Sequence, residues 1–173
     1  MKYLLFDLDL TLVDSSIAEA ARDSRNWPLV YSLIPRFHLY DGMEEVFSYI
    51  REHGQKVAII SSAPSVYINK VVRQFNLPAD VVIGYHDAAR KPSPDGFIKA
   101  LERLGGNWEE AISFGDRAID IQASHAAGIP AVACLWGTKE RERLEASGAK
   151  IEMAAPIEIM HYLEKAPMVT RSL

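Results

Sequence analysis

Two aspartates one residue apart, Asp7 and Asp9, follow an apolar run at the beginning of the chain. The run has the composition of a strand buried on both faces, so both carboxylates are expected just past its carboxyl end. Like charges held this close raise each other's cost of ionisation unless another group compensates them. The pair therefore indicates a site with a chemical role, and its neighbours decide which role.

Polar side chains follow the other predicted strands in the same way. Ser61 and Ser62 come after KVAII, Lys91 follows the DVVIGY segment, and Asp116 and Asp120 come after AISF. In open α/β sheets, ligands bind beyond the carboxyl ends of the strands. We therefore expect acids, hydroxyls and a lysine to converge on one edge of a sheet.

Several carboxylates in one crevice call for a hard divalent cation with oxygen ligands, Mg²⁺ above all. Bound Mg²⁺ favours phosphate as the partner, and a hydroxyl and a lysine are suitable donors to phosphoryl oxygens. Two neighbouring acids can take different parts, because one can attack as a nucleophile while the other moves a proton. The pattern predicts phosphoryl transfer with Mg²⁺ as the cofactor and a phosphorylated molecule as the partner.

The elements that must position these residues alternate along the chain. Apolar, strand-like runs occur at 3–9, 56–61, 80–85, 111–116 and 130–136, with a weaker one at 150–154. Helical patterns occur at 43–54, 64–76, 94–105, 119–128, 139–148 and 156–165. This alternation predicts an α/β fold of the Rossmann-like, doubly wound kind, with a parallel sheet and helices on both faces. The last residues, APMVTRSL, are expected to form a frayed tail.

The stretch at about 15–40 interrupts the alternation. It is rich in aromatic residues, is broken by Pro28 and Pro35, and has the length of about two helices. We interpret it as a small helical insertion, a short cap, held to the body by packing of its aromatic rings. Four of its side chains are candidates to grip an anionic leaving group. They are Arg22, Arg25, Arg36 and His38.

Length and composition limit the classes of protein that remain. The 173 residues fit one domain, 1–173, that includes the insertion. The formal net charge of −4 and the lack of a basic block argue against nucleic-acid binding as the main role. The opening residues predict neither a signal peptide nor a membrane span. The single cysteine, Cys134, is expected to pack as a small apolar residue. We therefore expect a cytoplasmic protein.

Four motifs in order resemble those of the haloacid dehalogenase superfamily of aspartate-nucleophile phosphohydrolases, in particular a phosphoglycolate-phosphatase-like core with a much reduced cap. They are DLDLT at 7–11, Ser61 in AIISSAP, Lys91 in RKPSPDGF, and GDRAID with Asp116 and Asp120. One such motif is weak support, but four at predicted strand ends form a specific pattern. Leu10 is a small departure, because many members have glycine there.

The resemblance implies a role for each of these residues. Asp7 would attack phosphorus and form an aspartyl-phosphate, and Asp9 would protonate the leaving oxygen and then activate water. Asp7, the backbone carbonyl of Asp9, and Asp116 would bind Mg²⁺, with Asp120 in support. The transferring phosphoryl group would be bound by Ser61 and Lys91. Ser62 is a second candidate for the substrate side and also a candidate cap for the helix that follows it.

The leading interpretation is a Mg²⁺-dependent phosphatase, and two alternatives stay open. One is a phosphomutase of the same superfamily, although the short cap argues against the shielding from water that a mutase needs. The other is a member that binds phosphate or a partner without catalysis. A short cap also leaves open whether the substrate is a small molecule or an exposed macromolecular phosphoester, and whether a second copy of the chain covers the site.

Overall fold

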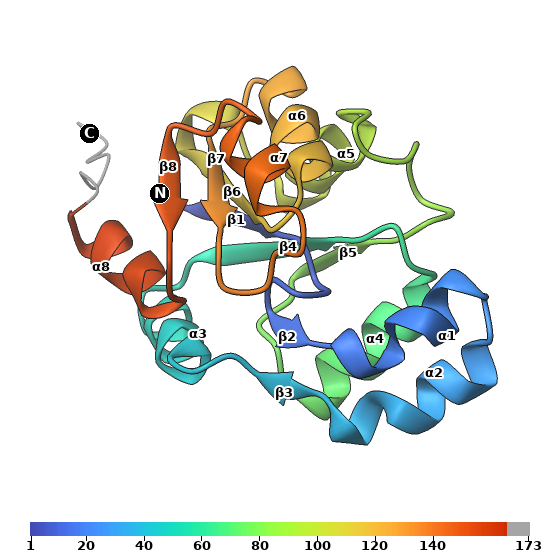
Figure 1. Ribbon diagram of the computed structural model, residues 1–173. Helices are drawn as coiled ribbons and strands as arrows, with labels where there is room; N and C mark the ends of the chain where they lie inside the picture. Colours follow the sequence, from blue (N-terminus) through green and yellow to red (C-terminus); the bar gives the residue numbers. More distant parts are fainter. Residues whose placement is uncertain (166–173) are drawn as a thin grey trace.

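A six-stranded parallel sheet forms the centre of the computed structural model, which describes residues 1–165; the predicted APMVTRSL tail lies outside these residues (Figure 1). The strand order is β5-β4-β1-β6-β7-β8. The strands are β1 (Tyr3–Phe6), β4 (Lys56–Ile60), β5 (Val81–Ile83), β6 (Ala111–Gly115), β7 (Ala131–Cys134) and β8 (Ile151–Met153). All neighbouring pairs run parallel, so the predicted fold class is confirmed.

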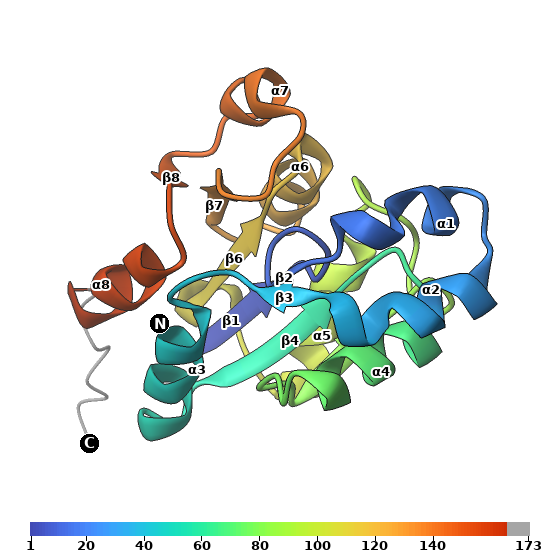
Figure 2. The same cartoon turned by 60° about the horizontal axis from the view of Figure 1, so that its bottom comes forward.

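Helices cover both faces of the sheet, as Figures 1 and 2 show from two directions. One face carries α3 (Met43–Glu52), α4 (Ser65–Gln74) and α8 (Ile157–Lys165), and the other carries α5 (Asp95–Leu104), α6 (Ala118–Ala126) and α7 (Arg141–Glu145). Strand β1 serves both layers, because Leu4 and Phe6 point into the first core and Tyr3 and Leu5 into the second. No helix in the described part of the chain is long and apolar enough to cross a membrane.

The register of the central strands sets where their polar residues emerge. Phe6, the last residue of β1, pairs with Ile59 of β4 and with Phe114 of β6. The rings of Phe6 and Phe114 stack with centroids 4.6 Å apart, and both are buried. Three strands therefore end at nearly the same level, and the residues that follow them share one edge of the sheet.

The short cap, residues 15–40, lies beside α4 in both views (Figures 1 and 2). It contains η1 (Ser16–Ala18), α1 (Glu19–Asp23), α2 (Trp27–Leu33) and η2 (Ile34–Arg36), so two short α-helices occupy it, as its length indicated. An antiparallel pair that was not predicted joins β2 (Val13–Asp14), just before the short cap, to β3 (His38–Leu39), near its end. The aromatic packing is as expected, because the ring of Trp27 lies 5.8 Å from that of Tyr67 on α4.

A carboxylate anchors the 84–91 loop, the segment that leaves β5 and ends at Lys91. Asp87 accepts hydrogen bonds from the backbone N–H of Gly84 at 2.8 Å and from Ser65 Oγ at 2.9 Å. Gly84 itself has no room for a side chain, since a Cβ there would overlap Ser65. The hydrogen bonds to the carboxylate, with Arg103 nearby, hold the pKa of Asp87 below its usual value.

This lowered pKa predicts how Asp87→Asn changes acid stability. The folded state binds the Asp87 proton more weakly than the unfolded state, so the carboxylate contributes stability above the unfolded pKa of about 4, and the contribution is lost as the pH falls through the folded pKa. We expect the variant to melt about 2–6 °C below the parent at pH 7 and to approach it near pH 3. Thermal melts from pH 7 to 3 measure the difference, and a gap that stays constant with pH would contradict the prediction.

Candidate active site at the carboxyl edge of the sheet

Asp7 stands directly after the central strand β1. Its backbone N–H donates to the carbonyl of Phe114 on β6, at 2.9 Å. The chain then turns sharply at Leu10, whose φ of 64° is in the left-handed region. Glycine adopts this conformation freely, whereas a residue with a Cβ loses about 1 kcal/mol. The turn thus explains in backbone terms why glycine is common at this position.

Asp116 and Asp120 reach the same edge from the end of β6 and from α6. Thr11 Oγ1 donates to Asp116 Oδ1 at 2.9 Å, so the threonine of the first motif fixes an acid of the fourth. Asp120 Oδ2 accepts from the backbone N–H of Arg117 at 3.0 Å. Gly115 packs so closely on Asp120 that an added Cβ would overlap its side chain. Both carboxylates are therefore held in fixed, buried positions.

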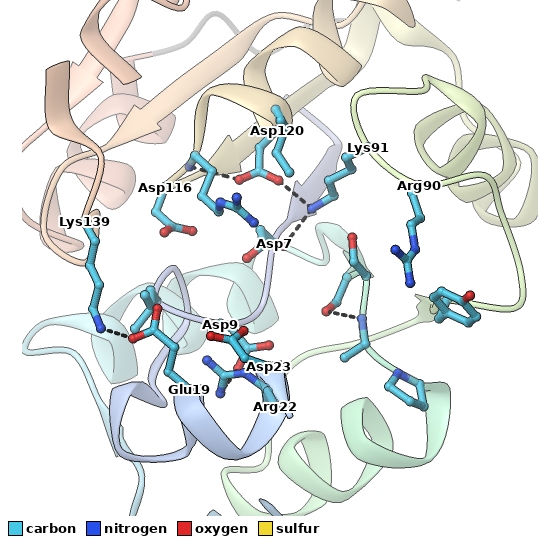
Figure 3. Close-up of a pocket in the computed structure, with 18 of the residues that line it drawn as sticks. Asp7, Asp9, Glu19, Arg22, Asp23, Arg90, Lys91, Asp116, Asp120 and Lys139 are labelled. Atoms are coloured by element: carbon cyan, nitrogen blue, oxygen red, sulfur yellow. Dashed lines mark hydrogen bonds and ion pairs between the residues drawn. The ribbon is translucent and has the colours of Figure 1, made fainter. Parts of the chain in front are cut away.

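Lys91 connects the acids, as Figure 3 shows. Its Nζ lies 2.7 Å from Asp7 Oδ1 and 2.7 Å from Asp120 Oδ1, and only 6% of its side chain is exposed. Burial alone would lower the pKa of this ammonium group, but the two carboxylates outweigh that effect and raise the pKa above its usual value. Lys91 is therefore a permanent positive charge in the site.

The three acids around Lys91 could hold a metal ion. One oxygen from each of Asp7, Asp116 and Asp120 lies within 4.8 Å of the others. Burial raises the pKa of Asp7 well above its usual value, and the other two carboxylates add to the rise against the opposing effect of Lys91. Burial and Asp120 likewise raise the pKa of Asp116 to about 7. Three carboxylates facing one ammonium group leave uncompensated negative charge, which fits a divalent cation.

The carboxylate of Asp9 is not part of this cluster, because it turns toward the short cap. Its Oδ1 accepts hydrogen bonds from Ser15 Oγ at 2.5 Å and from Tyr67 Oη at 2.6 Å, and Arg22 Nη1 lies at 3.0 Å. Burial and the Asp9 carboxylate raise the pKa of Tyr67, so its hydroxyl stays protonated and donates. The ligand role predicted for Asp9 rests on its backbone carbonyl and stays a prediction.

The two serines after β4 have different surroundings. Ser61 is buried, and its Oγ accepts from the backbone N–H of Ala63 at 3.1 Å, while Ser62 is exposed. Both line the cavity described below. Helix α4 begins after Pro64 without a side-chain cap, so the expected capping role of Ser62 is wrong. The substrate-binding roles of both serines stay predictions.

A cavity of about 750 Å³ opens above the acids. Asp7, Asp9, Ser61, Ser62, Lys91, Asp116 and Asp120 all line it, so the structure brings together the seven residues predicted for the catalytic, substrate-binding and metal-binding roles. Of the four cap candidates for an anionic group, only Arg22 and Arg25 are among its lining residues. The sequence did not single out three further lining residues, although they lie on the segment that leads to Lys91. They are Tyr85, His86 and Arg90.

Comparison with known proteins identifies relatives of the chain. A family model described as haloacid dehalogenase-like hydrolase matches residues 31–134, which include Ser61, Lys91, Asp116 and Asp120 but not Asp7 or Asp9. A phosphoglycolate phosphatase from Xanthomonas campestris is 31% identical over 102 residues, which are 57% of this chain and 46% of the relative. The pyrophosphatase PpaX from Bacillus cereus is 32% identical over 110 residues, or 62% of this chain and 51% of the relative.

The chain spans about half the length of the curated relatives it matches. Among solved structures, a hydrolase from Pseudomonas syringae superposes with a TM-score of 0.79 at 19% identity, covering 97% of this chain and 100% of that one. That likeness shows the shared fold. With the family match over more than half of its residues, the chain belongs to the haloacid dehalogenase-like hydrolase family.

Proposed function

We propose that the protein is a Mg²⁺-dependent phosphatase that hydrolyses the phosphomonoester of a small molecule, with Asp7 as the nucleophile and Asp9 as the general acid and base. The observation that carries the proposal is the position of Lys91 at the cavity, where it forms ion pairs with both Asp7 and Asp120. A fixed cation beside a nucleophilic carboxylate favours the approach of a dianionic phosphate.

Asp7, Asp116 and Asp120 would hold the metal ion, because their oxygens already lie close together and their negative charge exceeds what Lys91 can balance. Bound Mg²⁺ would neutralise this charge and polarise a phosphoryl oxygen. Lys91 adds a donor to the phosphoryl group, and Ser61, which is largely buried but lines the cavity after β4, supplies a hydroxyl. The raised pKa values of Asp7 and Asp116 support this assignment, since carboxylates desolvated in this way are stabilised by a cation.

In the first step, an oxygen of Asp7 attacks phosphorus and the ester P–O bond breaks. The leaving oxygen takes a proton from the carboxyl group of Asp9, which releases the alcohol and leaves an aspartyl-phosphate. Asp9 is suited to this part because its Oδ1 is fixed by three donors, while its Oδ2 makes no hydrogen bond with the described residues.

In the second step, the Asp9 carboxylate takes a proton from a water molecule, which attacks phosphorus. The P–O bond to Asp7 breaks, inorganic phosphate leaves, and the Asp7 carboxylate is regenerated. The short cap favours this outcome over a phosphomutase, because a mutase must shield its intermediate from water. A cavity of about 750 Å³ is within the usual range for small-molecule sites, which supports a small substrate.

Replacement of the two aspartates tests the chemistry. We expect Asp7→Asn to reduce phosphate release from a panel of phosphomonoesters by about 10⁴-fold or more, because the nucleophile is lost. Asp9→Asn is expected to reduce it by about 10²- to 10⁴-fold, as for loss of a general acid and base. Asp23→Asn is the matched control, since Asp23 is an exposed acid that lines the same cavity outside the cluster.

Phosphate release is measured with Mg²⁺ and with a chelator, and the panel includes an aryl phosphate. Release by the parent that disappears in Asp7→Asn and with the chelator, but persists in Asp23→Asn, is the expected result. Release that survives Asp7→Asn would refute the nucleophile, and release that is unchanged by chelation would refute the metal dependence. No release from any compound would refute the phosphatase proposal itself.

Thermal melts test the metal site without catalysis. We expect saturating Mg²⁺ to raise the melting temperature of the parent by about 5–10 °C, because a ligand at about 100 times its Kd adds roughly 2.7 kcal/mol to the free energy of unfolding. Asp116→Asn should lose most of this shift, whereas Asp23→Asn should keep it. An equal shift in all three proteins would place the bound ion elsewhere.

A further inference from the structure

An arginine of the 84–91 loop lies against an aromatic ring at the wall of the cavity. The guanidinium carbon of Arg90 is 4.5 Å from the centroid of the Tyr85 ring, and His86 meets the same ring edge-on at 4.7 Å. All three residues line the cavity. Figure 3 shows Arg90 next to Lys91 along the chain, with its side chain diverging from that of Lys91. The ring supports the guanidinium and limits its orientations.

The charge of Arg90 is not used within the part of the molecule that the structure describes. No carboxylate of residues 1–165 forms an ion pair with it, and its guanidinium makes no hydrogen bond there. Two other cavity cations are engaged, since Arg22 pairs with Asp9 and Lys139 with Glu19, whereas Arg25 of the short cap, like Arg90, has no ion pair within residues 1–165. Arg90 therefore presents a planar set of free donors that suits a carboxylate or phosphate oxyanion.

The loop that carries Arg90 is held on both sides of Tyr85 and His86. The backbone N–H of Tyr85 donates to the carbonyl of Ala63 at 2.8 Å, and Asp87 anchors the next turn. Further along, the backbone N–H of Ala89 donates to Asp95 Oδ2 at 2.8 Å. A loop fixed in this way needs little ordering when a ligand binds, which favours affinity and selectivity.

We propose that Arg90 is a specificity-determining residue that binds an oxyanion on the alcohol part of the substrate, so that preferred substrates carry a second anionic group close to the phosphoester. This inference rests on the proposed phosphatase function and names the substrate class of the same site. It assigns substrate selection to the 84–91 loop, which follows strand β5 of the sheet. The sequence instead indicated arginines and a histidine of the short cap as candidates to bind an anionic leaving group.

The position of Arg90 limits how far the second group can lie from phosphorus. Arg90 and Lys91 are consecutive, so their Cα atoms are about 3.8 Å apart, and Lys91 reaches the proposed nucleophile directly. Both cations therefore start from adjacent residues of the cavity wall, with Lys91 directed at Asp7 and Arg90 at the Tyr85 ring. A compact phosphoester with a carboxylate a few bonds from phosphorus can reach both.

Matched substrate pairs test this assignment. Phosphoglycolate and ethyl phosphate differ by a carboxylate in place of a methyl group, as do comparable longer pairs, and p-nitrophenyl phosphate reports the chemistry of a substrate whose aryl part carries no second anionic substituent. We expect the parent to prefer the carboxylated member by tenfold or more in kcat/KM. Arg90→Gln should reduce this preference by about 10- to 100-fold, mainly through KM, since a charge-assisted pair is lost. Hydrolysis of p-nitrophenyl phosphate should change by less than about twofold.

Two further variants separate the alternatives. Arg90→Lys should restore only part of the preference, because lysine keeps the charge without the planar fork. Arg25→Gln removes a cavity-lining arginine of the short cap that has no ion pair within residues 1–165, and it should leave the preference intact.

Three results would overturn the assignment. They are a parent without preference in any pair, a preference lost in Arg25→Gln but kept in Arg90→Gln, and an equal loss on p-nitrophenyl phosphate in Arg90→Gln. In each of these cases p-nitrophenyl phosphate is still hydrolysed by the parent, so the proposed function stands. Failure of the parent on every compound is the separate result that rejects the function.

Discussion

The ion pairs of Lys91 with Asp7 and Asp120 are the interaction on which the site depends. They join a residue after β1, a residue of α6 and the end of the 84–91 loop, three segments far apart in the chain. Burial makes such a cluster costly unless every charge has a partner, and one ammonium group cannot satisfy three carboxylates. The sheet therefore holds an arrangement that is electrostatically incomplete, which is the physical basis for proposing a metal ion.

The acids and the lysine could be located from sequence because a parallel sheet aligns the carboxyl ends of its strands. Asp7 and Asp116 follow β1 and β6, whose register pairs Phe6 with Phe114, and an apolar run followed by an acid was enough to place each. The alternation of strands and helices was equally visible, since strands covered on both faces leave continuous apolar runs. Apolar runs and the residues that end them are local features of the sequence, and this part of the fold follows from such local features.

Side-chain directions were not accessible in the same way, because they depend on contacts between distant segments. The carboxylate of Asp9 turns toward Ser15, Arg22 and Tyr67. The DLDLT motif alone does not predict this direction of the side chain. In the sequence, Arg90 is simply the residue before the lysine of the third motif. It faces the cavity because Ser65 and Asp95, which belong to helices α4 and α5, hold the loop through hydrogen bonds to Asp87 and Ala89. The β2–β3 pair was missed because two-residue strands have no periodicity to detect.

The contacts on Asp9 join the short cap to the proposed general acid and base. Ser15 and Arg22 belong to the short cap, yet they contact the same oxygen as Tyr67 of α4. A tilt of α1 must therefore either break these contacts or rotate the Asp9 side chain about its χ1 bond. The position of the proposed proton donor therefore depends on the short cap, because Ser15 and Arg22 contribute two of the three contacts on Asp9 Oδ1.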